Sequence, residues 1–146
     1  MSTSTGRNSG NGVPRLRAVI DTNVVLSGIT HRGIPNRILQ AGTDRWFAWI
    51  YSSEILDEYL RIGRRFGYAE EMVRTIAVLH SAGYPVQVPS FLPETFQEIT
   101  DVQDRTIFAA ARVGNAVFVT GNHRHFPWKS YSGVQILSPR DFYDML

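Results

Sequence analysis

The chain lacks cysteine altogether and contains a single lysine, Lys129. Without cysteine there are no disulfide bonds and no thiolate metal sites, and this fits the reducing cytoplasm, where we expect the protein to act. No apolar run approaches the roughly 20 residues that a membrane span requires. The first residues also lack the apolar segment of a signal peptide, so we expect neither membrane insertion nor export.

Net charge is also low, because the formal charge of the 146 residues sums to only +2. That value is too small to indicate nucleic-acid binding by itself. Apart from Lys129 the basic side chains are arginine, whose planar guanidinium suits phosphate better than an ammonium does. A genome rich in G and C produces the same bias, and the sequence leaves both explanations open.

The chain does contain enough apolar material, 43% of its residues, for one domain with a core. We expect this domain to span residues 15–146, after a disordered N-terminal tail over residues 1–14 that is rich in Ser, Thr, Gly and Asn. Short apolar runs predict strands at residues 16–20, 46–50, 85–88, 116–120 and 134–137. Helical periodicity and capping residues predict helices over residues 35–41, 53–62, 69–80 and 104–113, and another from residue 139.

Strands that alternate with helices imply parallel pairing with right-handed crossovers. The sequence therefore predicts an α/β fold, with three layers (α/β/α) around a central, mostly parallel sheet.

Polar side chains gather where the expected strands and helices begin or end. Asp21 directly follows the first strand, and further polar clusters occur at residues 54–58, 101–104 and 122–123. Open parallel sheets bind ligands beyond the carboxyl ends of their strands. Acids far apart in the sequence can thus converge there on one metal site.

Each acid taken alone also has an ordinary structural explanation. Asp21 suits a turn, and Glu58 shares a helix face with Glu54, where it could simply be solvated. Asp101 and Asp104 would stabilise a helix N-terminus. The joint arrangement of these acids is the stronger signal.

Two other enzyme classes that use a polar turn after the first strand fit poorly. A haloacid-dehalogenase-type phosphatase needs a second acid where Asn23 stands, and a catalytic lysine for which Lys129 is the sole candidate. A dinucleotide-binding domain needs a glycine-rich first turn, which residues 21–25 do not provide.

Five blocks of the chain match one family in order and spacing. They read AVIDTNVVLSG (residues 18–28), SSEILDEY (52–59), DVQD leading into AAA (101–111), VFVTGN (117–122) and VQILSPRDF (134–142). In these blocks the chain resembles the PIN-domain ribonucleases, in particular the branch of toxins from toxin–antitoxin pairs. The resemblance extends from about Leu16 to the C-terminus.

The resemblance implies an Mg²⁺- or Mn²⁺-dependent endoribonuclease that cleaves single-stranded RNA with a metal-activated water. It also implies a small antitoxin partner and a homodimer. Carried over by position, the catalytic acids would be Asp21, Glu58 and Asp104. The metal ligands would be Asp21, Asp104, Asp101 and Asn122, with Thr22, Asn23 and Thr120 as supporting residues. Such crowded acids should repel one another without metal, so some should have raised pKa values.

Asn122 departs from the family pattern, which usually has an acid after Thr-Gly. An amide oxygen can still bind a hard cation, but one negative charge is lost. The chain could work as a one-metal enzyme. Alternatively, it could be a catalytically degenerate module that binds RNA or a protein partner without cleavage.

Several basic or aromatic side chains were weighed as RNA contacts. We expect His31 and Arg32 to line the same rim as Asp21, and His123 and Arg124 to lie beside Asn122. The competing explanation is that these residues simply lie in exposed loops. We place His125 in the same exposed loop as His123. Histidine is a poor Mg²⁺ ligand. We expect Trp46 and Trp49 to pack in the core rather than to stack on bases.

Overall fold

The computed structural model describes residues 14–91 and 94–146, so the expected N-terminal tail lies outside the described residues except for its last position. The elements are β1 (Arg17–Ile20), α1 (Thr22–Thr30), α2 (Ile34–Thr43), β2 (Ala48–Tyr51), α3 (Ser53–Arg65), α4 (Ala69–Ala82), β3 (Tyr84–Pro85), α5 (Val102–Val113), β4 (Val117–Val119), β5 (Ser130–Tyr131), β6 (Val134–Leu137) and α6 (Pro139–Tyr143). In the part of the chain that the structure describes, no helix is both long and apolar enough to cross a membrane.

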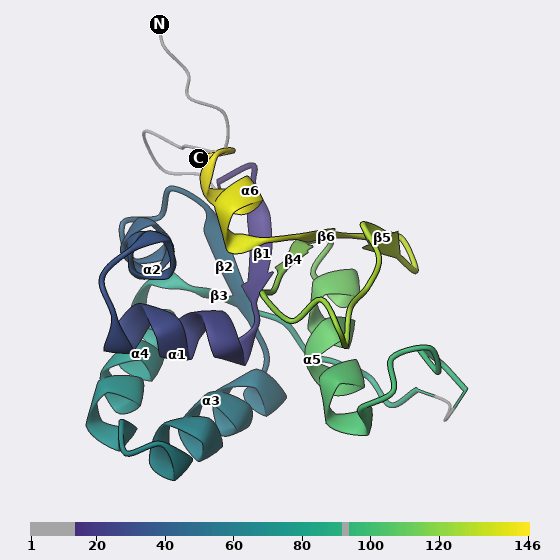
Figure 1. Cartoon of the computed structure of the whole chain (residues 1–146), viewed down its shortest axis with the longest axis horizontal. Helices are drawn as coiled ribbons and strands as arrows, with labels where there is room; N and C mark the ends of the chain where they lie inside the picture. Colours follow the sequence, from purple (N-terminus) through teal and green to yellow (C-terminus); the bar gives the residue numbers. More distant parts are fainter. Residues whose placement is uncertain (1–13, 92–93) are drawn as a thin grey trace, which may run out of the picture.

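The strands form one sheet in the order β3-β2-β1-β4-β6-β5. All neighbouring strands pair in parallel except β5, which runs antiparallel to β6. Helices α1, α2 and α4 lie on one side of the sheet and α5 lies on the other (Figure 1). The predicted α/β fold with a mostly parallel central sheet is therefore confirmed, and β1 lies near its middle.

Burial on both faces explains the composition of the central strands. In β1, Ala18, Val19 and Ile20 are completely buried, and every residue of β2 is buried. A parallel strand covered by helices on both faces needs such an unbroken apolar run. The carboxyl ends of β1 and β4 lie side by side at the same edge of the sheet, because the two strands are parallel neighbours.

Aromatic rings fix α5 against the rest of the molecule. Phe108 of α5 packs edge-on against Phe118 of β4, with ring centroids 5.4 Å apart, and stacks on Phe126 at 6.0 Å. Phe118 and Phe126 also contact each other at 4.8 Å. This cluster joins α5, β4 and the loop after β4, and these three segments carry much of the site described below.

The structure corrects four details of the prediction. Helix α1 was not predicted, and it starts directly after Asp21, where a loop was expected. Helix α5 begins at Val102 rather than Asp104, because the side chain of Asp101 caps it by accepting a hydrogen bond from the Gln103 N–H (2.9 Å). Strand β5 was also missed. Trp46 precedes β2 and is 37% exposed, whereas Trp49 is buried as expected.

Candidate active site

Asp21 occupies the carboxyl end of the central strand and is only 7% exposed. One carboxylate oxygen accepts a hydrogen bond from the Thr22 N–H (2.8 Å), which makes Asp21 the N-cap of α1. The other accepts one from the Thr120 hydroxyl (2.7 Å). The main-chain N–H of Asp21 donates to the carbonyl of Val119 (2.8 Å). These bonds hold the carboxylate between β1 and β4.

The charge of Asp21 is costly where it lies. Burial raises the pKa of this carboxyl from its ordinary 3.8 to about 6, and the negative charges of Asp104 and Glu58 add to the rise. The hydrogen bonds from Thr120 and Thr22 act in the opposite direction. Asp21, Glu58 and Asp104 are therefore close enough for their charges to interact. The pKa values of Asp21 and Asp104 are raised, as expected, but burial contributes more than the expected mutual repulsion.

Glu58 reaches the same region from α3. Its side chain is 13% exposed and accepts hydrogen bonds from the Arg61 guanidinium (2.7 and 3.1 Å) and from the Gln103 amide (3.1 Å). Gln103 belongs to α5, so this bond links the two helices that carry the acids. Arg61 is an exposed cation on the next turn of α3, and it partly neutralises Glu58.

Tyr59 positions α3 beside Asp21, and the sequence analysis missed this role. Tyr59 is fully buried, and its hydroxyl donates a hydrogen bond to the carbonyl of Ile20, the residue before Asp21. Since Tyr59 directly follows Glu58, the bond ties the second acid to the strand that carries the first. In the sequence this tyrosine is only the last residue of the block 52–59, and its polar hydroxyl was the available signal.

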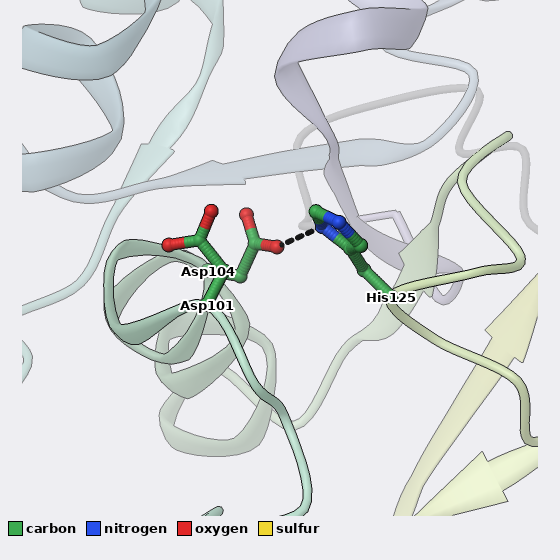
Figure 2. Close-up of side chains that lie close together, drawn as sticks. All are labelled: Asp101, Asp104 and His125. Atoms are coloured by element: carbon green, nitrogen blue, oxygen red, sulfur yellow. Dashed lines mark hydrogen bonds and ion pairs between the residues drawn. The ribbon is translucent and has the colours of Figure 1, made fainter.

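Asp101, Asp104 and His125 form the tightest group of possible metal ligands among the described residues, with their ligand atoms within 4.8 Å of one another. Figure 2 shows Asp101 and Asp104 at the start of α5 and His125 on the loop after β4. The Nδ1 atom of His125 lies 2.8 Å from Oδ2 of Asp104. Burial raises the pKa of Asp104, helped by the charges of Asp101 and Glu58 and opposed by His125.

The His125 side chain is 41% exposed, so it reaches solvent as expected, but its contact with Asp104 was not expected. Its ring contacts Asp104 because the loop after β4 folds back toward the start of α5. Its neighbours His123 and Arg124 are exposed, as expected, and remain beside Asn122.

Asn122 holds the loop after β4, and Asn122 and Asn23 line the same pocket. The side-chain oxygen of Asn122 accepts a hydrogen bond from the His125 N–H (3.3 Å), and its own N–H donates to the Thr120 hydroxyl (3.0 Å). Asn23 is exposed, and the two asparagines line a pocket of about 450 Å³ together with Ser27 and Gly121. Thr22 supports Asp21 through its main chain rather than its hydroxyl.

His31 and Arg32 do not share a rim with Asp21. Helix α1 separates them, since His31 is its C-cap and Asp21 its N-cap. A helix of 9 residues spans roughly 13 Å. Both side chains are exposed.

The donor set fits a divalent cation. Carboxylate oxygens are the ligands that Mg²⁺ and Mn²⁺ prefer. Three acids crowd here against one another, and the buried Asp21 holds its carboxylate with hydroxyl and N–H donors. A bound cation would offset both the burial of the Asp21 charge and its repulsion by Asp104 and Glu58, which together raise the pKa of Asp21.

Comparisons with known proteins agree with this geometry. The family model described as "PIN domain" matches residues 17–124. Similar solved structures include VapBC2 from Rickettsia felis bound to a DNA fragment from its promoter (17% identity, TM-score 0.59, 84% of this chain and 98% of that one). They also include DNA-bound VapBC from Salmonella typhimurium (18%, 0.58, 85% and 98%) and VapBC-1 from nontypeable Haemophilus influenzae (18%, 0.55, 86% and 99%).

At these identities the solved structures establish a shared fold, and no curated protein matches the chain. The family model, however, covers most of the sequence and includes β4 as well as β1, α3 and α5, the elements that position the acids. The chain therefore belongs to the PIN-domain family.

Proposed function

We propose that the protein is a metal-dependent endoribonuclease that cleaves single-stranded RNA in the cytoplasm, as the toxin of a toxin–antitoxin pair. The observation that supports this most strongly is the crowding of Asp21, Glu58 and Asp104 at the carboxyl end of β1, where burial and mutual repulsion raise the pKa of Asp21 to about 6. Such a cluster does not stabilise the fold, because buried like charges cost free energy.

The residues have distinct roles in this proposal. Asp21 and Asp104 would hold Mg²⁺ or Mn²⁺, with Asp101 beside them, and Glu58 would orient the attacking water by accepting its hydrogen bond. A divalent cation in such a site lowers the pKa of water and neutralises charge on the phosphate. Thr120 keeps Asp21 in place, and Tyr59 keeps α3 in place.

The pocket beside Asn122 supports an RNA substrate. Its lining includes Asn23, Asn122 and Ser27 beside a valine and two prolines, and it contains no charged residue. Neutral donors and acceptors suit the edges of an unpaired base or a ribose hydroxyl. His123 and Arg124, exposed on the adjoining loop, would contact the phosphates that flank it.

The antitoxin and the homodimer belong to the same proposal. A similar solved structure is described as a toxin–antitoxin complex from Klebsiella pneumoniae (19% identity, TM-score 0.56). The electrostatic argument is that an arginine from a partner would be attracted to a crowded acidic site. Within the chain, Arg61 already makes such a contact with Glu58.

The test is cleavage of a labelled single-stranded RNA by the full chain with Mn²⁺, and with EDTA as the metal-free control. We expect Asp21→Asn and Asp104→Asn each to lower the rate at least roughly a hundredfold, since each removes an electrostatic contact to the reacting groups. Glu54→Gln is the matched control: it removes an acid one helical turn from Glu58 and should leave the rate unchanged.

The competing function is a degenerate module that binds RNA or protein without cleavage, as the amide at position 122 suggests. It predicts RNA binding that persists in Asp21→Asn and Asp104→Asn, without metal-dependent cleavage by the wild type. That result would contradict the nuclease proposal.

A further inference from the structure

The loop after β4 is a compact turn that uses Asn122 as its anchor. The Asn122 side-chain oxygen accepts the His125 N–H at 3.3 Å, and its main-chain carbonyl accepts the Phe126 N–H at 3.1 Å. The amide oxygen that could replace a carboxylate ligand is thus engaged within the turn. Asn122 shapes the loop, and another residue faces the acids.

Phe126 fixes the turn to α5. It is 1% exposed and packs on Phe118 of β4 and on Phe108 of α5, with ring centroids 4.8 and 6.0 Å away. Phe108 lies one helical turn after Asp104, on the same face of α5. The residue before Phe126 is therefore held against Asp104, and that residue is His125.

We propose that His125 supplies the metal ligand that Asn122 does not, so that the imidazole, Asp101 and Asp104 together bind a divalent transition metal. This inference rests on the proposed metal-dependent function and names the preferred class of metal. Neighbouring ligand atoms around an octahedral cation lie about 3 Å apart when each bond is close to 2.1 Å. The His125 Nδ1 and Asp104 Oδ2 atoms are already 2.8 Å apart.

The exchange of a carboxylate for an imidazole changes selectivity as well as charge. Imidazole suits the later first-row metals, whereas Mg²⁺ prefers oxygen ligands. A site with His125 as a ligand should therefore favour Co²⁺ over Mg²⁺ more strongly than oxygen ligands alone would. Replacing the imidazole should therefore remove the part of this metal preference that His125 contributes.

The experiment titrates the full chain with Co²⁺ and with Mg²⁺ by calorimetry, for the wild type and for His125→Gln. We expect the variant to lose at least about tenfold in Co²⁺ affinity and less than about threefold in Mg²⁺ affinity. The ratio of Co²⁺ affinity to Mg²⁺ affinity should therefore fall. His123→Gln is the matched control, because His123 is an exposed histidine on the same turn, and its ratio should equal that of the wild type.

A second readout does not depend on affinity. Proton NMR of the Co²⁺-loaded wild type should show a strongly shifted resonance from a metal-bound imidazole, which His123→Gln retains and His125→Gln lacks. No such resonance in the wild type would overturn the proposal even if His125→Gln failed to fold. His125→Asp should move the preference toward Mg²⁺, and an unchanged ratio in that variant would also contradict the proposal.

Two further outcomes separate this proposal from the proposed function. Equal losses of Co²⁺ and Mg²⁺ affinity in His125→Gln would mean that His125 only orients Asp104, which overturns the ligand role while the nuclease stands. No binding of either metal by the wild type, combined with metal-independent behaviour toward RNA, would overturn both.

Discussion

Asp21 carries the largest electrostatic cost among the acids of the site. Its carboxylate is buried, receives hydrogen bonds from Thr22 and Thr120, and faces the charges of Asp104 and Glu58. A raised pKa in the folded state means that folding binds the proton more tightly than the unfolded chain does. The metal-free protein therefore loses stability as pH rises from about 4 through about 6.

Asp21→Asn should remove that loss in the metal-free protein. The shift from 3.8 to about 6 corresponds to about 3 kcal/mol. We expect the free energy of unfolding of the variant, relative to the wild type, to increase by that order between pH 4 and pH 7. Urea unfolding in EDTA at both pH values measures it, with the exposed Asp57→Asn as the control. Parallel pH curves for Asp21→Asn and the wild type would contradict the assigned pKa.

Single residues also mark the limit of what the sequence can predict. Asp21, Asp104 and Glu58 were identified because strand ends and family blocks fix their place along the chain. The contact of His125 with Asp104 was missed because the two residues lie 21 positions apart and the contact depends on how Phe126 packs. The role of Tyr59 was missed because its hydroxyl bonds to Ile20, a residue 39 positions away at the end of β1.

Among the elements, α3 and α4 pack closely because α3 has a glycine, Gly63, at their contact. A Cβ added at Gly63 would lie 2.7 Å from the Cβ of Met72, an atom that cannot rotate away. Helix α3 also carries Glu58 and Tyr59, so the spacing of α3 and α4 affects the position of the second acid.

Gly63→Ala should therefore destabilise the protein, even though alanine favours helix by roughly 1 kcal/mol. Overpacking of this kind costs up to about 3 kcal/mol, so we expect a net loss near 2 kcal/mol. Chemical denaturation measures it. Gly121→Ala, where an added Cβ meets nothing within 4 Å, should change stability by less than about 0.5 kcal/mol. If Gly63→Ala left the free energy of unfolding unchanged, α3 and α4 would have to move apart at no cost.

Sequence patterns predicted most elements but not all of their boundaries. The predicted helix over residues 69–80 appears as α4, and Gly83 follows its end as its C-cap. Helix α1 escaped prediction because Thr22, Val24 and Val25 are β-branched and resemble a continued strand. Its formation follows from the N-cap at Asp21 and from packing against α2 and α3. Strand β5 has two residues and pairs with β6, and it is too short to show the apolar pattern that predicts a strand.

Over the whole molecule, metal binding and folding should be coupled. A ligand that binds only the folded state at about a hundred times its Kd adds about 2.7 kcal/mol of stability. For a chain of 146 residues this corresponds to a rise in Tm of roughly 10 °C. Thermal unfolding with saturating Mn²⁺ should show that rise in the wild type, and EDTA should reverse it.

Asp104→Asn should abolish most of the Mn²⁺-dependent rise, whereas Glu54→Gln should keep it. Equal rises in both variants would mean that Mn²⁺ binds outside the acidic site.

The outer strands of the sheet have a consequence for how copies of the protein behave in a crowded solution. The strands at the two edges, β3 and β5, contain two residues each, and β3 includes Pro85, whose nitrogen carries no hydrogen to donate. Long, flat edges recruit strands from other chains and seed aggregation. Edges this short provide little template for it, so the folded protein should stay dispersed at high concentration.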